Sequence, residues 1–182
     1  VLGLNGAGKT TMLTSLCDVH RGARFDVLRY RGREVRPGDE RFKAARYLSL
    51  ADDSSFPTWN LEAFIGFLEH AYRLRPDRGR LEELIEGFDY GRYRTTAFSR
   101  LSSGSRKKAN LLAAFSLTPP LLFLDEPVDF PAFAATEFLY RCITDVVASG
   151  PSVLLSSHIA ASFTRCPRAP YVLPAGRLTG PF

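Results

Sequence analysis

The chain has 182 residues, of which 45% are hydrophobic and 24% charged, and these proportions predict one globular domain. It shows no apolar run near the ~20 residues that cross a bilayer and no signal-peptide pattern. Cys17, Cys142 and Cys166 have neither metal-ligand nor disulfide spacing, so we expect reduced thiols in the cytosol. The net charge is +5, and we interpret the arginine-rich stretches 29–36 and 73–80 as solvated faces, with nucleic-acid or lipid contact as the alternative.

The most informative motif is G-x-x-x-x-G-K-T from Gly3 to Thr10, the pattern of a phosphate-binding loop. Gly6 and Gly8 have no Cβ, so the backbone can turn tightly and direct several N–H groups at one phosphate. Lys9 supplies a positive charge for the terminal phosphates, and the Thr10 hydroxyl can ligate Mg²⁺. The motif predicts that the chain binds ATP or GTP with Mg²⁺, the alternative being a plain glycine-rich turn before a helix.

The nucleotide contacts are expected from the loop and the first helical turn: Asn5, Gly6, Ala7, Gly8, Lys9, Thr10 and Thr11. A helix from Thr10 to about His20 would direct its positive N-terminal end at the same phosphates. The chain has no Asn-Lys-x-Asp guanine motif, which favours ATP over GTP. Phosphate loops normally follow a buried strand, and only Val1 and Leu2 precede this one, so we expect that the first strands are missing.

The rest of the chain alternates between expected strands and helices, which predicts an α/β domain. In chain order, the expected elements are a short hairpin at 24–36, a strand at 46–50, helices at 61–73, 81–87 and 103–117, a strand at 121–125, a helix at 133–149, a strand at 153–157, a short helix, and strands at 171–173 and 177–179. The continuous apolar run 121–124 is typical of a strand that is buried on both faces of a parallel sheet.

Two carboxylates end this apolar strand, in the sequence Asp125-Glu126-Pro127. An aspartate at the carboxyl end of a buried strand beside a phosphate loop can hold Mg²⁺ through water. Glu126 would then face the water that attacks the terminal phosphate and could act as its general base. The alternative is that Asp-Glu-Pro only begins a turn.

Two more motifs complete a recognisable order: Leu101-Ser102-Ser103-Gly104-Ser105 before a helix, and Ser156-Ser157-His158 at the end of a strand. Together with the phosphate loop and the Asp-Glu-Pro strand, they resemble the ATP-binding cassette (ABC) ATPases over nearly all 182 residues. The resemblance implies a P-loop NTPase (RecA-like) domain over 1–182, with a mostly parallel sheet flanked by helices, a small antiparallel β hairpin and an α-helical subdomain at about 56–118. Residues 101–105 are called the signature segment below.

The resemblance also implies roles and partners. Two cassettes of the family sandwich two ATP molecules, so Ser102 and Gly104 would contact the ATP that is held by a second ABC ATPase subunit, in a homodimer or a heterodimer. His158 matches the family histidine that reaches the γ-phosphate and would join Glu126 and Lys9 in catalysis. A separate transmembrane permease would dock on 56–73, which places the chain in the cytoplasm, peripheral on the inner face of the cell membrane; the alternative for the aromatic residues of this stretch is that they belong to the core. A role on nucleic acid is not expected, although a soluble ABC protein of that kind is an alternative.

The chain departs from the family pattern at three places. Leu50 or Ala51 stands where the family has a glutamine that touches Mg²⁺, with Asp52 or Asp53 as a possible substitute. The signature segment has serine at two positions, and Ala132 takes the place of an aspartate in the loop after Pro127. We therefore expect tight Mg-ATP binding with slow or partner-dependent hydrolysis. A weakly hydrolytic or non-hydrolytic ATP-binding partner in a heterodimer is the alternative.

The first turn of the helix after the signature segment contains three cations, Arg106, Lys107 and Lys108. Cations at this end oppose the helix dipole by ~0.3–1 kcal/mol each, so we expect them either to receive a polyanion or to form an exposed basic patch. His20 and His70 have no motif around them and are expected on helix surfaces.

Overall fold

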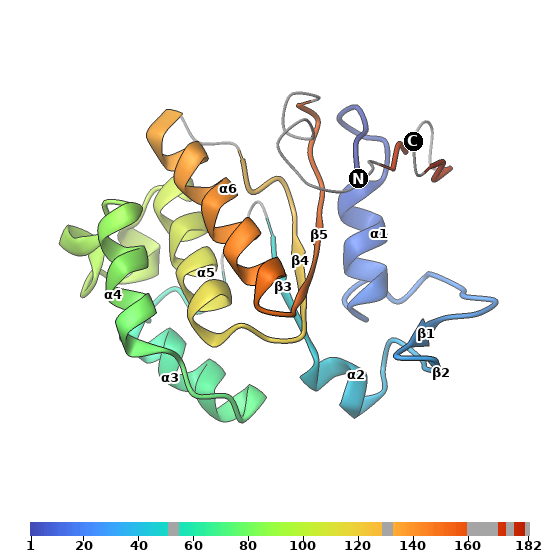
Figure 1. Ribbon diagram of the computed structural model, residues 1–182, viewed down its shortest axis with the longest axis horizontal. Coiled ribbons are helices and arrows are strands. Elements are labelled where there is room, and N and C mark those ends of the chain that lie inside the picture. The colour runs from blue at the N-terminus through green and yellow to red at the C-terminus, as the bar shows by residue number, and fades with distance from the viewer. Residues whose placement is uncertain (51–54, 129–132, 160–170, 174–176, 181–182) are drawn as a thin grey trace.

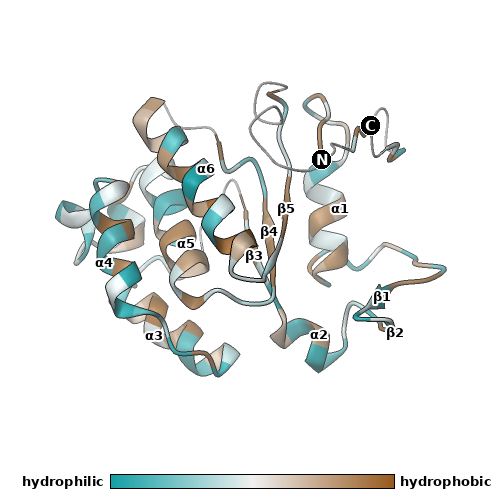
Figure 2. Ribbon diagram, viewed as in Figure 1, coloured by the Kyte–Doolittle hydropathy of each residue, from teal (hydrophilic) through white to brown (hydrophobic). Residues whose placement is uncertain are grey.

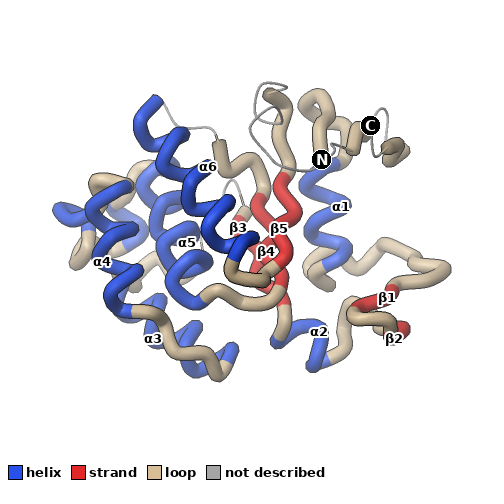
Figure 3. Tube along the Cα trace, in the orientation of Figure 1, coloured by secondary structure: helices blue, strands red, loops and turns tan. Residues whose placement is uncertain are grey.

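The computed structural model describes residues 1–50, 55–128, 133–159, 171–173 and 177–180. Its centre is a parallel sheet in the order β3 (Arg46–Ser49), β4 (Leu121–Leu124) and β5 (Ser152–Leu155). In register, Ser49 pairs with Leu124, and Leu124 pairs with Leu155 (Figures 1 and 3). The carboxyl ends of the three strands therefore lie at one edge, where the sequence has its polar motifs.

The phosphate loop is reached from the same sheet. Leu2 bridges Ser157 and Val172 in parallel, and Val172 bridges Thr179 in antiparallel. The amide of Gly3 donates to the Ser157 carbonyl at 3.3 Å. The start of the chain thus runs beside the end of β5, and this pairing brings the loop next to the residues that follow β4 and β5 (Figure 1).

The helices cover the two faces of the sheet. In Figures 1 and 3, α1 (Lys9–Leu16) lies on one side, and α5 (Ser103–Leu117) and α6 (Phe133–Ala148) lie on the other. Farther from the sheet, α3 (Leu61–Tyr72) and α4 (Arg78–Gly87) pack on α5. Brown apolar faces meet between these helices in Figure 2, with teal polar residues outward.

Local sequence explains the helix boundaries. The side chain of Asn60 accepts a hydrogen bond from Ala63 N at the start of α3, and Asp77 accepts one from Arg80 N at the start of α4. Such caps satisfy amides that have no partner within the helix. Inside, α5 buries eleven of its residues, and its fully buried Leu111, Leu112 and Phe115 form the centre of the core.

Most expected elements are confirmed within two or three residues, but the first helix and the hairpin are shorter than expected, and the strands expected at 171–173 and 177–179 are reduced to an isolated bridge between Val172 and Thr179. The first helix ends at Leu16 and not near His20, because Asp18 takes a left-handed φ of 62° and reverses the chain; His20 therefore lies beyond the helix. The expected hairpin is reduced to β1 (Arg29–Tyr30) and β2 (Arg33–Glu34). A helix that the sequence analysis missed, α2 (Glu40–Ala44), precedes β3.

The arginine-rich stretches agree with the solvated-face interpretation where they are described. Arg78 forms an ion pair with Glu62 at 3.3 Å, and Arg80 forms pairs with Glu83 and Asp145 at 3.1 and 3.0 Å. Cys17 and Cys142 are free thiols, whereas Cys166 and the short helix expected near it lie outside the described residues. None of the described helices combines the length and the apolarity needed to cross a membrane.

Candidate active site

The phosphate loop has the backbone shape that its glycines predict. Gly6 and Gly8 have φ of 80° and 98°, in the region that residues with a Cβ avoid. Gly8 is the N-cap of α1, and Met12 N donates to its carbonyl at 2.9 Å. The amides before Met12 in this first turn have no acceptor within the helix. They remain available for an anion at the positive end of the helix dipole.

Gly3, the first glycine of the motif, serves a different purpose. A Cβ on Gly3 would lie 3.0 Å from the carbonyl oxygen of Leu173 and 3.2 Å from the Cβ of Ala7. The amide of Leu173 donates to Leu2 O at 2.7 Å, so this backbone is fixed by the sheet and cannot yield easily. Gly3 thus permits the loop to pack against the segment 171–173, a contact between distant segments that the sequence analysis did not predict.

Lys9 is the central cation of the site. Its ammonium donates to the carbonyls of Gly3 and Leu4 at 2.8 and 3.1 Å, and it forms an ion pair with Glu126 Oε1 at 3.0 Å. The side chain is 6% exposed, so its charge is largely removed from water and depends on these partners. The loop and the end of β4 are therefore joined through one buried ammonium group.

Asp125 lies opposite the threonine of the loop. Thr10 Oγ1 donates to Asp125 Oδ2 at 2.8 Å, and the fully buried Ser156 donates to Oδ1 at 2.6 Å. The carboxylate is 3% exposed, and its backbone amide donates to Ser49 O at 2.8 Å. Neighbouring strands of the sheet thus fix Asp125 on both sides.

These donors fit Mg²⁺. Hydroxyl and carboxylate oxygens suit this hard cation, which keeps several waters and is held by one or two protein groups with substrate phosphates. The described residues contain no cluster of three His, Cys, Asp or Glu side chains that would enclose a metal. Thr10 and Asp125 thus supply two oxygen ligands, which fits a Mg²⁺ ion that is bound together with substrate phosphates.

Glu126 is held by three parts of the chain. Its amide donates to Ser156 Oγ at 3.1 Å, and its Oε2 accepts from His158 N at 3.2 Å and lies 3.0 Å from His158 Nδ1. Its Oε1 carries the ion pair with Lys9. Burial raises the pKa of Glu126, but the hydrogen bonds from Lys9 and His158 outweigh it and leave the pKa below its ordinary value. Glu126 is thus held as a carboxylate.

The structure brings together five of the predicted residues: Lys9, Thr10, Asp125, Glu126 and His158. Ser156 is hydrogen-bonded to both Asp125 and Glu126, but the sequence analysis gave it no role of its own. Its position at the carboxyl end of a strand beside β4 could have indicated this role.

The signature segment lies at the start of another helix. Ser102 is the N-cap of α5 and accepts a hydrogen bond from Ser105 N at 3.2 Å. Its side chain is exposed, and a Cβ on Gly104 would meet nothing within 4 Å. In the described part of the chain, neither residue is hydrogen-bonded to the phosphate loop. Within one chain, these two residues are therefore open to another molecule.

The expectation for the three cations after this segment was wrong. Arg106 Nη1 donates to Leu101 O at 2.9 Å, Lys107 Nζ to Glu126 O at 3.0 Å, and Lys108 Nζ to Phe88 O at 2.6 Å. Because backbone carbonyls hold all three, they are neither an open polyanion site nor a freely exposed patch.

The structure describes only some of the positions at which the sequence departs from the family pattern. Leu50 follows β3 and lines a hollow of about 380 Å³ with Tyr47 and Phe56. Ala51, Asp52 and Asp53, the other candidates for the metal side, and Ala132 after β4 lie outside the described residues.

Comparisons with known proteins agree with this geometry. The family profile described as ABC transporter matches residues 1–129. The chain is 29% identical to the putative ABC transporter ATP-binding protein AlbC of Bacillus subtilis, over 87% of this chain and 68% of AlbC. It is 34% identical to the daunorubicin resistance ATP-binding protein DrrA2 of Streptomyces coeruleorubidus, over 86% of this chain and 49% of DrrA2. The chain therefore spans about half to two thirds of these relatives.

A solved structure described as the ATP-binding subunit of an ABC transporter superposes with a TM-score of 0.84 at 26% identity, over 98% of this chain and 75% of that chain.

Proposed function

Because the chain belongs to the ABC transporter family and has the fold of its ATPases, we propose that it binds Mg-ATP on residues 3–11 and hydrolyses it to power a transporter. The observation that carries the proposal is the convergence of Lys9, Thr10, Asp125, Glu126 and His158 at one edge of the sheet. Three separate segments of the chain supply these groups, and a structural ion pair alone requires only two of them.

Each residue has a role that follows from its position. The loop amides and Lys9 bind the phosphates, with Asn5, Ala7 and Thr11 completing the contact surface. Thr10 and Asp125 hold Mg²⁺, which neutralises phosphate charge when it is bound. Glu126, whose pKa is held below its ordinary value, accepts a proton from water, and His158 orients the Glu126 carboxylate through its backbone amide and ring.

The signature segment supports a second subunit in this proposal. Ser102 and Gly104 are open at the N-terminus of the 15-residue helix α5, where the helix dipole favours a phosphate. We assign them to the ATP that is bound by a second ABC ATPase subunit, identical or different. The two sites would then each need residues from both chains, which makes hydrolysis depend on dimerisation.

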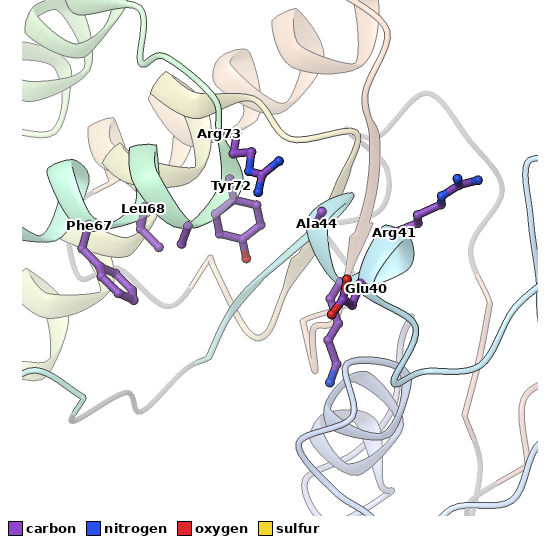
Figure 4. A pocket seen from close by; sticks show the side chains of 9 residues that line it. Glu40, Arg41, Ala44, Phe67, Leu68, Tyr72 and Arg73 are labelled. Atoms are coloured by element: carbon purple, nitrogen blue, oxygen red, sulfur yellow. The ribbon is translucent and has the colours of Figure 1, made fainter.

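A surface away from the loop supports a permease partner at the cytoplasmic face of a membrane. A hollow of about 640 Å³ lies between α2 and α3. Figure 4 shows side chains from both helices around it: Glu40, Arg41, Ala44, Phe67, Leu68, Tyr72 and Arg73. Phe67 is 43% exposed, and aromatic residues beside arginines are common in protein interfaces. We assign this surface to a cytoplasmic segment of a separate transmembrane permease.

We further propose that hydrolysis is slow without that permease. Leu50 or Ala51 stands at the place of the family glutamine, and neither residue type has a side-chain oxygen that could ligate a metal. The two serines that depart from the family pattern in the signature segment would lie at the ATP site of the second subunit. Binding residues are therefore complete, whereas those that link hydrolysis to partners are altered.

The proposal is tested by nucleotide binding and turnover of three variants. Lys9→Ala should weaken Mg-ATP binding at least tenfold, because it removes the buried cation of the loop. Glu126→Gln should abolish turnover and leave Mg-ATP binding intact. Arg92→Ala is the matched control, since Arg92 is exposed and its ion pair with Asp89 lies outside both the loop and the hollow between α2 and α3. Unchanged affinity in Lys9→Ala, or turnover at the parent rate in Glu126→Gln, would overturn the assignment.

A further inference from the structure

Lys107 is a buried lysine that the proposed ATPase mechanism does not use. It is 7% exposed, at the start of the second turn of α5, and its ammonium donates to the backbone carbonyl of Glu126 at 3.0 Å. Among the described residues it has no carboxylate within ion-pair distance. Burial of an ammonium without a counter-ion is unfavourable, so stability alone does not account for this residue.

The atom that Lys107 contacts belongs to a strained residue. Glu126 has a φ of 46°, in the left-handed region that side chains with a Cβ rarely adopt. Such a conformation persists only when its surroundings hold it on several sides. Ser156 holds the amide of Glu126 at 3.1 Å, and Lys107 holds the carbonyl. These two contacts fix the peptide groups on both sides of the Glu126 Cα and so set the direction of its carboxylate.

Lys107 also connects two functional segments. It follows Ser102, the N-cap of α5, by five residues on the same rigid helix. Tyr47 Oη donates to Asn110 Oδ1 at 3.0 Å, which ties the next turn of α5 to β3. A displacement of the signature segment along α5 would therefore move the ammonium that holds Glu126.

We propose that Lys107, on α5, is a positioning residue: it fixes the backbone of Glu126 and thereby directs the carboxylate toward the attacking water. This inference rests on the proposed ATPase function and adds a route by which contact of Ser102 and Gly104 with a second subunit's nucleotide affects the carboxylate of their own chain. Lys107 itself touches neither nucleotide nor water in this role.

The first test is the turnover of Lys107→Met with Mg-ATP. Methionine keeps most of the buried length and removes the donor, so kcat should fall ten- to a hundredfold while KM stays within threefold. Lys107→Arg keeps a donor and should recover most of kcat. Lys108→Met is the matched control, because Lys108 is a neighbouring lysine whose ammonium donates to a carbonyl far from the site, that of Phe88. If Lys107→Met retains the parental kcat, or loses no more than Lys108→Met, the proposal is wrong.

The second test does not depend on hydrolysis, so it separates failure of this inference from failure of the ATPase proposal. The chain has three histidines, and only His158 contacts Glu126. In NMR spectra of the nucleotide-free protein, Lys107→Met should shift the ring resonances of His158 and leave those of His20 and His70 in place. Lys108→Met should leave all three unchanged. Unshifted His158 resonances in folded Lys107→Met would overturn the inference even if the parent protein hydrolyses ATP.

A variant that keeps polarity guards against a loss of folding. Should Lys107→Met not fold, Lys107→Gln is the substitute. The glutamine side chain is one bond shorter than that of lysine and ends in a polar amide. This variant is expected to show the same His158 shift and the same fall in kcat, and unchanged values would contradict the proposal.

Discussion

Nζ of Lys9 lies 3.0 Å from Oε1 of Glu126, so the cation of the phosphate loop is paired with the candidate general base in the nucleotide-free chain. An incoming phosphate would compete with this carboxylate for the same ammonium. The ion pair compensates the buried charge of Lys9 and the partly buried charge of Glu126 until nucleotide arrives, and it links the occupancy of the loop to the freedom of Glu126.

The first prediction concerns the pH dependence of stability. Glu126 has a folded-state pKa below its ordinary value, so it stabilises the fold above the unfolded-state pKa of about 4.3, and this contribution is lost as the pH falls through the folded-state pKa. Glu126→Gln should lower the free energy of unfolding by about 1–3 kcal/mol at pH 7. Denaturant titrations between pH 7 and 3 should show this difference shrinking toward the acid end.

Exposed Glu34 provides the control for that experiment, because it has no ion-pair partner among the described residues. Glu34→Gln should change stability little at any of these pH values. A Glu126→Gln deficit that persists undiminished at pH 3 would show that the charge of Glu126 is not its source.

Ser156 gives the second prediction. It is fully buried and holds both Asp125 and Glu126, at 2.6 and 3.1 Å. Ser156→Ala should cost about 1–3 kcal/mol of stability and reduce turnover, because the Glu126 amide loses its acceptor in a buried place. Ser116→Ala is the comparison, since Ser116 is also buried, but its hydroxyl donates within α5, to Ala113 O at 3.3 Å. Equal turnover in the two variants would remove Ser156 from the site.

The third prediction separates the fold from the site. A Cβ at Gly87, in α4, would collide with the ring of Phe138 in α6. Gly87→Ala should destabilise the chain by about 1–3 kcal/mol in thermal or denaturant unfolding, through overpacking, and leave Mg-ATP affinity unchanged. Gly66→Ala, on α3 with nothing within 4 Å of the added Cβ, should be neutral or stabilising by up to about 1 kcal/mol. Equal stability of the two variants would contradict the packing of α4 on α6.

A fourth prediction tests the hydrogen bond between Tyr47 in β3 and Asn110 in α5. Tyr47 is 4% exposed and donates to Asn110 Oδ1 at 3.0 Å. Tyr47→Phe should reduce the free energy of unfolding by about 1 kcal/mol. In a double-mutant cycle with Asn110→Ala, the two side chains should show a coupling energy of at least about 0.5 kcal/mol. Additive effects would mean that the hydrogen bond contributes nothing measurable.

Long elements with a clear hydrophobic pattern were predictable from the sequence, whereas short connecting elements were not. The apolar run before Asp125 and the helical spacing from Leu61 predicted β4 and α3, because periodicity reports burial directly. The short α2 and the early end of α1 were missed, since a five-residue helix has little periodicity and the left-handed Asp18 gives no clear signal. Motifs with a fixed local shape were therefore predictable, and short connecting elements were not.

Lys107 shows the same limit within the site. From the sequence, Lys107 is a cation near the start of a helix, where the helix dipole makes a positive charge unfavourable. Only the packing of α5 beside β4 brings its ammonium to the carbonyl of Glu126, nineteen residues away in the sequence. No pattern of residue types along the chain contains that contact.

The sequence by itself determined the phosphate loop, the buried strand that ends in two carboxylates and the family to which they belong, because these depend on local backbone freedom and on burial. Tertiary structure alone decided which partners hold those groups: Lys9 on the Glu126 carboxylate, Ser156 on the Asp125 carboxylate and the Glu126 amide, and Lys107 on the Glu126 carbonyl. The physical reason is that hydrogen bonds and ion pairs act over about 3 Å, and only strand register and helix packing bring distant residues that close.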